Sequence, residues 1–120
     1  MMQVLRAAGL FAANAIWRAT GSQAAGRTLL NALASSDANI RTIAGMFLVR
    51  AGDKAVPLIK EALHRQLNLP QVLVMAGDIG SKKLEPELQK FAAHPDPQVS
   101  RAARDGLKIM AAQNLKPAAR

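Results

Sequence analysis

The stretch HPDPQVSRAARDGLKIM, residues 94–110, predicts a tight turn followed at once by a helix. Pro95 and Pro97 end the preceding helix and stiffen the turn, because a proline disfavours the helical conformation in the residue before it. Asp96 stands where an N-cap side chain accepts a hydrogen bond from the helix backbone, and Val99 starts the apolar stripe of the new helix. The stretch therefore predicts a corner between two helical units.

Two upstream segments repeat this pattern. DANIRTIAGMFLVRAG begins at Asp37, and LPQVLVMAGDIG begins at Leu69. In all three segments a β-branched residue is followed by an apolar residue three positions later and by an alanine four positions later, which is helical spacing. The alanines are Ala44, Ala76 and Ala103. We expect these small side chains to let a neighbouring helix approach closely.

A second pattern follows the first two segments. Each copy has a glycine, a polar N-cap residue, a lysine and then a proline, followed by leucine or isoleucine at helical spacing. Glycine ends one helix, the polar residue caps the next, and proline is tolerated because it lies in the first turn. The residues are Gly52, Asp53 and Pro57 in one copy and Gly80, Ser81 and Pro86 in the other. The repeating unit is therefore a helical hairpin of about thirty residues.

Residues 96–107, DPQVSRAARDGL, are similar to the Asp-Pro-x-Val-Arg-x-x-Ala-x-x-x-Leu start of HEAT repeats. Together with the glycine-to-proline segments, they make residues 37–112 resemble the short HEAT-like repeats common in bacterial proteins. The resemblance implies a short right-handed α-α superhelix of about seven helices, and it implies no particular ligand. Arg101 lies one place later than the family's arginine, whereas Arg41 directly follows Ile40 and fits the role of the arginine that bonds between repeats.

Composition agrees with an all-helical fold. Apolar residues make up 50% of the 120 residues, enough to bury a core in a single domain, but only 3% are aromatic. We expect one HEAT-like domain over 1–120, with capping helices in 1–36, repeats in 37–112 and a tail in 113–120. The expected helices cover residues 3–19, 22–35, 38–51, 54–67, 70–79, 82–93 and 97–112.

The N-terminus resembles a targeting segment only in part. The uncharged run AAGLFAANAIW, residues 7–17, follows Arg6, and SQA at 22–24 has the pattern of a signal cleavage site. However, Asn14 interrupts the run, Arg18 follows it, and eleven residues are too few to cross a bilayer. We expect a mature first helix in a cytoplasmic protein, with a signal peptide or an organelle presequence as the alternative.

Residues that catalyse reactions or bind metals are not expected. The chain has no cysteine, and Glu61 with His64 forms a single Glu-x-x-His motif, whereas a di-iron bundle needs two. HEAT-type metal hydroxylases use His-Glu dipeptides, but here Arg65 follows His64 and Pro95 follows His94. We therefore expect no catalytic residue, no cofactor and no metal, and instead a pairing of Glu61 with Arg65 along the helix.

The resemblance places the second helix of each hairpin on the concave face of the superhelix. That face is then the expected binding surface for a protein or peptide, and the chain is expected to serve as a scaffold or adaptor. Its charge is basic on balance but mixed, which suits a partner with acidic or mixed charge. The candidate residues are Lys54, Lys60, Glu61, His64, Arg65, Lys83, Gln89 and Lys90.

Two other partners remain open. The net charge of +8 is concentrated in residues 1–36 and 95–120. In the last helix, one face carries Arg101, Arg104 and Lys108. Nucleic-acid binding through these basic ends is therefore one alternative. Association of the first helix with an acidic membrane surface is the other. The oligomeric state is left open.

The first helix also carries an expected interface. Phe11 and Trp17 lie on an alanine-rich helix with more apolar surface than one neighbour can cover. In HEAT-like DNA glycosylases an aromatic side chain stacks on a base, and Trp17 would be the candidate here. However, the apolar run around Trp17 is typical of core or interface packing. We expect Phe11 and Trp17 to contribute to docking or self-association.

Overall fold

The computed structural model describes residues 2–115, with side chains from Arg6 onward, and this range is all-helical without a strand. The expected fold class is therefore confirmed at this level. The chain divides into two compact units, Met1–Ala51 and Gly52–Arg120. We call them the N-terminal unit and the C-terminal unit. The single domain and the superhelical arrangement stay predictions.

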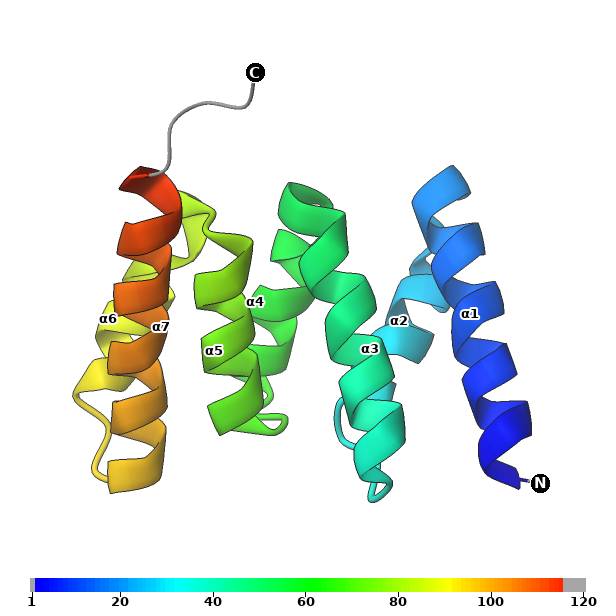
Figure 1. The fold of residues 1–120 in the computed structure, drawn as a ribbon, viewed down its shortest axis with the longest axis horizontal. Helices are drawn as coiled ribbons and strands as arrows, with labels where there is room; N and C mark the ends of the chain where they lie inside the picture. The colour runs from blue at the N-terminus through cyan, green and yellow to red at the C-terminus, as the bar shows by residue number, and fades with distance from the viewer. Residues whose placement is uncertain (1, 116–120) are drawn as a thin grey trace. The chain divides into compact units, whose positions relative to one another are not determined.

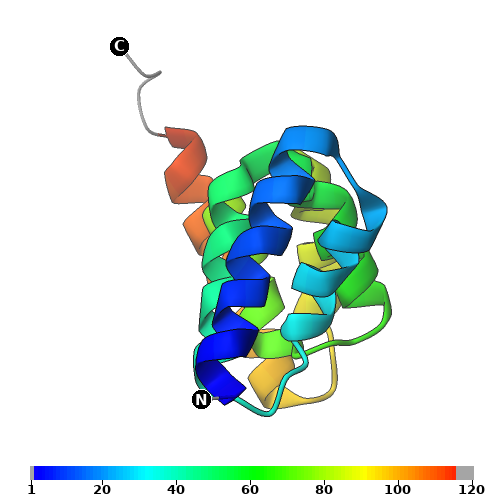
Figure 2. The ribbon, with the colours of Figure 1, turned by 90° about the vertical axis from the view of Figure 1, so that its right-hand side faces the viewer.

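The N-terminal unit holds three helices: α1 (Met2–Thr20), α2 (Gln23–Ala32) and α3 (Ala38–Ala51). Figure 2 shows α1 with α2 on one side and α3 on the other, and α1 contacts both. On α1 the side chains of Leu10, Ala13 and Trp17 are buried. The ring of Phe11 meets that of Phe47 on α3 edge to face, with the centroids 4.9 Å apart.

The C-terminal unit contains more elements. In chain order they are the short 3-10 helix η1 (Gly52–Ala55), α4 (Val56–His64), α5 (Leu69–Ile79), the 3-10 helix η2 (Lys82–Leu84), α6 (Glu85–Ala92) and α7 (Pro97–Leu115). Figure 1 shows α5 and α7 side by side. Helix α7 also packs on α6, and α5 packs on α4.

Two glycines allow α5 and α7 to touch through their backbones. A Cβ atom built on Gly77 of α5 would lie 2.4 Å from the carbonyl oxygen of Gly106 on α7. A Cβ atom on Gly106 would lie 2.5 Å from the carbonyl oxygen of Leu73. No side chain fits in either place without moving a helix backbone, so this contact requires glycine on both helices.

The repeat pattern locates the core. Ala44, Ala76 and Ala103 are fully buried, so all three repeated alanines lie in the core. The capping prediction is confirmed at Asp96, and Asp37, at which no cap was predicted, caps its helix in the same way. Asp37 Oδ1 accepts a hydrogen bond from the Asn39 amide at 2.8 Å, and Asp96 Oδ1 accepts one from the Gln98 amide at 2.9 Å. Both capped helices begin at the next residue, as the sequence pattern predicts.

The glycine-to-proline segments agree with the prediction except at one residue. Gly52 and Gly80 have positive φ angles of 63° and 74° and follow α3 and α5. Ser81 Oγ accepts a hydrogen bond from the Lys83 amide at 3.3 Å, so it caps as expected. Asp53 does not cap a helix start, because it lies inside the 3-10 turn η1 and α4 begins only at Val56.

Some helix ends differ from the expected bounds. Helix α2 ends at Ala32 and not at 35, because the amides of residues 33–35 bond to carbonyls three residues back. Helix α7 extends to Leu115, into the expected tail. There the side-chain amides of Gln113 and Asn114 donate to the carbonyls of Asp78 and Gly80 at the end of α5. These bonds satisfy carbonyls that a helix end leaves unpaired. Residues 116–120 of the expected tail lie outside the described residues.

We predict that Gly77→Ala lowers the free energy of unfolding by about 1–3 kcal/mol, because the new methyl group overlaps the Gly106 backbone. Gly9→Ala is the matched control, since Gly9 lies within α1 and nothing is within 4 Å of its Cβ position. That control should stabilise the chain by about 0.5–1 kcal/mol through helix propensity. Urea unfolding followed by circular dichroism measures both, and equal effects would contradict the backbone contact.

Candidate functional site

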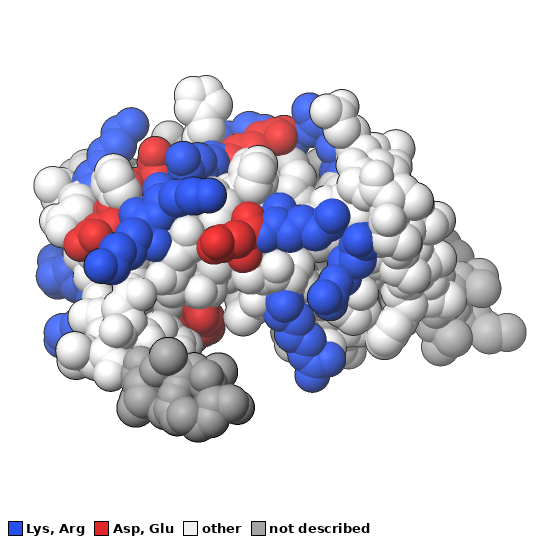
Figure 3. All heavy atoms as spheres, turned by 90° about the horizontal axis from the view of Figure 1, so that it is seen from above, with Lys and Arg blue, Asp and Glu red and all other residues white. Residues whose placement is uncertain are grey.

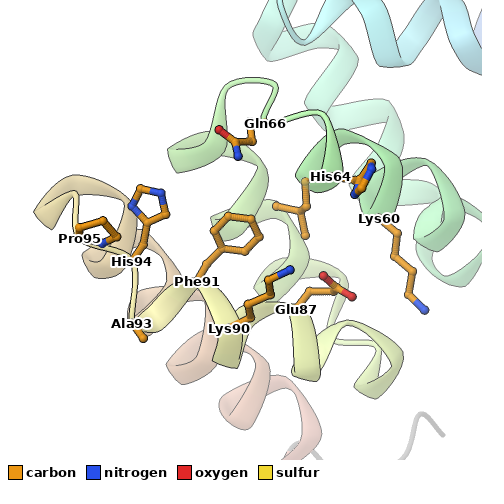
Figure 4. Close-up of a pocket in the computed structure, with 10 residues that line it drawn as sticks. Lys60, His64, Gln66, Glu87, Lys90, Phe91, Ala93, His94 and Pro95 are labelled. Carbon is orange, nitrogen blue, oxygen red and sulfur yellow. The ribbon is translucent and has the colours of Figure 1, made fainter.

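The C-terminal unit contains a hollow of about 770 Å³ between the ends of α4 and α6. This volume falls within the range of about 300–1,000 Å³ usual for ligand pockets. Leu63 and Phe91 are almost completely buried and form its floor, while Lys60, His64 and Lys90 are exposed on its rim. Figure 4 shows these side chains around the opening. The remaining lining residues are Gln66, Glu87, Ala93, His94 and Pro95.

The two walls of the hollow carry the same pair of side chains. Residues 60–64 are KEALH, and residues 90–94 are KFAAH, so lysine and histidine recur four residues apart near the ends of α4 and α6. All four of these side chains line the hollow, and they include both histidines of the chain. A spacing of thirty residues, the repeat period, brings the two pairs to the same place.

The corner after α6 fixes the second histidine. His94 Nδ1 accepts a hydrogen bond from the amide of Asp96 at 3.0 Å, so the neutral ring carries its proton on Nε2. The imidazole also stacks on Phe91, with the ring centroids 6.1 Å apart and the planes at 23°. Asp96 thus caps α7 with its carboxylate and orients His94 with its amide. The hollow gains a rigid aromatic surface beside a hydrogen-bond donor.

The end of α4 positions Gln66 at the mouth of the hollow. The Leu67 amide donates to the Ala62 carbonyl and the Gln66 amide donates to the Leu63 carbonyl, which is the Schellman pattern. In this pattern Gln66 takes the left-handed conformation with φ 58°, a position where glycine is usual. The unfavourable conformation explains why α4 ends at His64 and not at 67 as expected. It also turns the Gln66 side chain toward the hollow (Figure 4).

The structure brings together three of the eight residues expected on the binding surface. Lys60, His64 and Lys90 line the hollow. Glu61 and Arg65 form the expected ion pair, at 3.4 Å between carboxylate and guanidinium. This pair does not line the hollow, and neither do the remaining three expected residues, Lys54, Lys83 and Gln89. Sequence reasoning missed Glu87, Phe91 and His94, although the recurring lysine–histidine pair was a signal for His94.

Of the two aromatic residues expected to form an interface on α1, only Phe11 is exposed. Trp17 is only 5% exposed, so it belongs to the core and offers no surface to a partner. Phe11 is 55% exposed and Ile16 is 51% exposed. An interface on α1 therefore depends on Phe11 and Ile16. Trp17 was a wrong choice because it lies on the opposite side of the helix, which periodicity alone does not orient.

The surface carries charges of both signs. Figure 3 shows Asp and Glu side chains lying among Lys and Arg side chains over much of one face. In the hollow, Glu87 accompanies Lys60 and Lys90, so the lining is basic on balance. Among the described residues, no three histidine, aspartate or glutamate side chains are grouped closely enough to hold a metal ion.

A scan against protein-family models, a search of curated proteins and a search of solved structures each find no match to this chain. Between residues 2 and 115, no helix combines the length and the apolar character that a membrane span requires.

We predict that Gln66→Gly raises the free energy of unfolding by about 0.5–1 kcal/mol, because glycine adopts the left-handed conformation without strain. Gln89→Gly makes the same change within α6, and there it should cost about 1 kcal/mol of helix propensity. Thermal unfolding of both variants gives the comparison. A destabilised Gln66→Gly variant would show that the conformation of Gln66 is not strained.

Proposed function

We propose that this chain is a non-catalytic binding module that holds a peptide or protein segment of acidic or mixed charge in the hollow of its C-terminal unit. The observation that carries the proposal is the combination of the Leu63 and Phe91 floor with the Lys60 and Lys90 rim. A HEAT-like arrangement of its hairpins is part of the same proposal. The duplicated lysine–histidine pair and the repeated Asp caps support it.

The chemistry of the hollow favours a side chain that is partly apolar next to a carboxylate. Apolar atoms of a ligand gain by covering the small part of Phe91 that is left exposed, 9% of its surface, at the centre of the hollow in Figure 4. A carboxylate is attracted by the two lysines and can accept a hydrogen bond from His94 Nε2. Glu87 disfavours a strongly acidic ligand at its own side of the rim, so a segment with one or two carboxylates fits better than a phosphate chain.

A fluorescein-labelled peptide that places leucine and phenylalanine between acidic residues tests this function by anisotropy. We expect a Kd on the order of 10–100 µM, because one hollow is smaller than a standard protein interface. The same peptide with lysines replacing its acids should bind at least about tenfold more weakly, since it meets the basic rim.

Lys90→Glu should weaken binding of the acidic peptide at least about fivefold, because it reverses a rim charge. Lys108→Glu is the matched control: Lys108 is exposed on α7 and does not line the hollow, so this variant should bind as the wild type does. An equal loss of peptide affinity in both variants would show that affinity depends only on the net charge of the chain. That result would contradict binding in the hollow.

Nucleic-acid binding through the basic ends is the second candidate, and the exposed side chains of Arg101, Arg104 and Lys108 on α7 favour it. Asp105 is exposed among them, and no aromatic side chain of α7 accompanies them. We therefore predict that duplex DNA and RNA bind with a Kd on the order of micromolar or weaker at physiological salt, falling steeply as salt rises. Submicromolar, sequence-dependent binding in a gel-shift titration would put this candidate first.

A further inference from the structure

The N-terminal unit also contains a hollow, of about 360 Å³, which we call the N-terminal hollow. This volume lies at the lower end of the range of about 300–1,000 Å³ usual for ligand pockets. The lining comes from α1, α2, the turn after α2 and the start of α3, all within one unit. The lining residues that decide what it can bind are Arg6, Gly9, Leu10, Asn31, Ser35 and Ile40.

Gly9 lines the N-terminal hollow although the fold does not require a glycine there. A glycine within a helix is destabilising relative to alanine. At Gly77 and Gly106 a neighbouring backbone explains the glycine, but nothing lies within 4 Å of the Cβ position of Gly9, and its φ angle is not positive. A glycine that packing does not require, in the wall of a hollow, leaves room for a ligand to approach the helix backbone.

The mouth of the N-terminal hollow offers hydrogen-bond donors. Arg6 uses one of its five N–H groups on the hydroxyl oxygen of Ser35, at 2.9 Å. Ser35 Oγ also accepts a hydrogen bond from the Asp37 amide at 3.0 Å, so both of its lone pairs are used and its own proton is left to donate. The exposed side-chain amide of Asn31 adds two further N–H groups. A ligand group that accepts several hydrogen bonds fits this mouth.

Charge indicates that the accepting group is an anion. The unit Met1–Ala51 contains five arginines and a single acidic residue, Asp37, which gives it a net charge of +4. No carboxylate is among the residues that line the N-terminal hollow. Arg6 bonds there to a neutral hydroxyl, so its charge is available to a ligand. Its planar guanidinium matches the two oxygens of a carboxylate.

The floor determines the rest of the ligand. Leu10 and Ile40 are only 4% and 3% exposed, and no aromatic ring lines the N-terminal hollow. An aliphatic chain therefore suits the floor. We propose that the N-terminal hollow binds a small carboxylic acid with a short aliphatic chain, whose carboxylate pairs with Arg6 and whose chain passes Gly9 onto the floor.

Titration of the ¹⁵N-labelled full chain with sodium hexanoate, followed by ¹H–¹⁵N NMR, tests the proposal. The amide signals of Gly9, Asn31 and Ile40 should move with one Kd on the order of 1–10 mM, because a ligand of about eight non-hydrogen atoms gains little binding energy. Hexan-1-ol, which has the same chain without the charge, should bind at least about fivefold more weakly. This site is independent of the hollow of the C-terminal unit, since it stays largely empty at the micromolar peptide concentrations that fill that hollow.

Arg6→Gln tests the anion contact. It removes the charge but keeps a side-chain amide that can donate to Ser35, and it should weaken hexanoate binding at least about fivefold. Arg18→Gln is the matched control, because Arg18 is also exposed on α1 but does not line the N-terminal hollow. This control removes the same net charge and should bind hexanoate as the wild type does.

Gly9→Leu tests the place of the aliphatic chain. The leucine side chain takes up the room beside the α1 backbone and should weaken hexanoate binding at least about tenfold, while its high helix propensity preserves α1. Ala15→Leu is the matched control, because Ala15 is exposed on α1 and does not line the N-terminal hollow. Circular dichroism should show the helical content of the wild type in both variants.

Any one of four results would overturn the proposal. The first is that the amide signals of Gly9, Asn31 and Ile40 do not move at about 50 mM hexanoate, well above the expected Kd. The second is that hexan-1-ol binds as tightly as hexanoate. The third is an equal loss of affinity in Arg6→Gln and Arg18→Gln, which would show an effect of net charge alone. The fourth is an unchanged affinity in Gly9→Leu, which would show that hexanoate binds elsewhere.

Discussion

The backbone contact between Gly77 and Gly106 is the constraint on which the C-terminal unit depends. It sets the distance between α5 and α7, because nothing larger than a hydrogen atom fits between the two helices there. Helix α4 packs on α5, and α6 packs on α7, so the two walls of the hollow are each held by one member of this pair. A small change in the separation of α5 and α7 would therefore be passed on to Lys60 and His64 on one wall and to Lys90 and Phe91 on the other. Side-chain amides at the end of α7 tie the same two helices together at Asp78 and Gly80.

The local conformation at two helix ends completes the hollow. The Schellman turn at Gln66 aims one side chain at its mouth, and the turn after α6 presents His94 against Phe91. The first conformation has a cost, since Gln66 has a positive φ angle, whereas the hydrogen bond from the Asp96 amide to His94 Nδ1 stabilises the second. A rigid apolar floor with a basic rim loses little conformational entropy when a ligand binds, which is what a small binding module needs.

Helical periodicity was sufficient to predict most of the elements. Ala44, Ala76 and Ala103 are buried as expected, and Asp37 and Asp96 cap their helices, because these roles depend on neighbours within one turn. The features that periodicity did not predict depend on contacts between distant residues. Gly77 and Gly106 look like unfavourable helix residues until the two helices are placed together, and Phe91 looks like ordinary core. Trp17 was assigned to an interface because an apolar run does not tell which side of the helix faces the neighbours.

The central claim is that the hollow between α4 and α6 binds a ligand with an apolar side chain next to a carboxylate. Two-dimensional ¹H–¹⁵N NMR of the full chain, titrated with the unlabelled acidic peptide, tests it most directly. The account predicts that the amide signals that move will belong to residues 60–66 and 87–96, with those of α1 and of the exposed side of α7 unchanged. Shifts centred on Arg101, Arg104 and Lys108, or spread evenly over all basic residues, would contradict it.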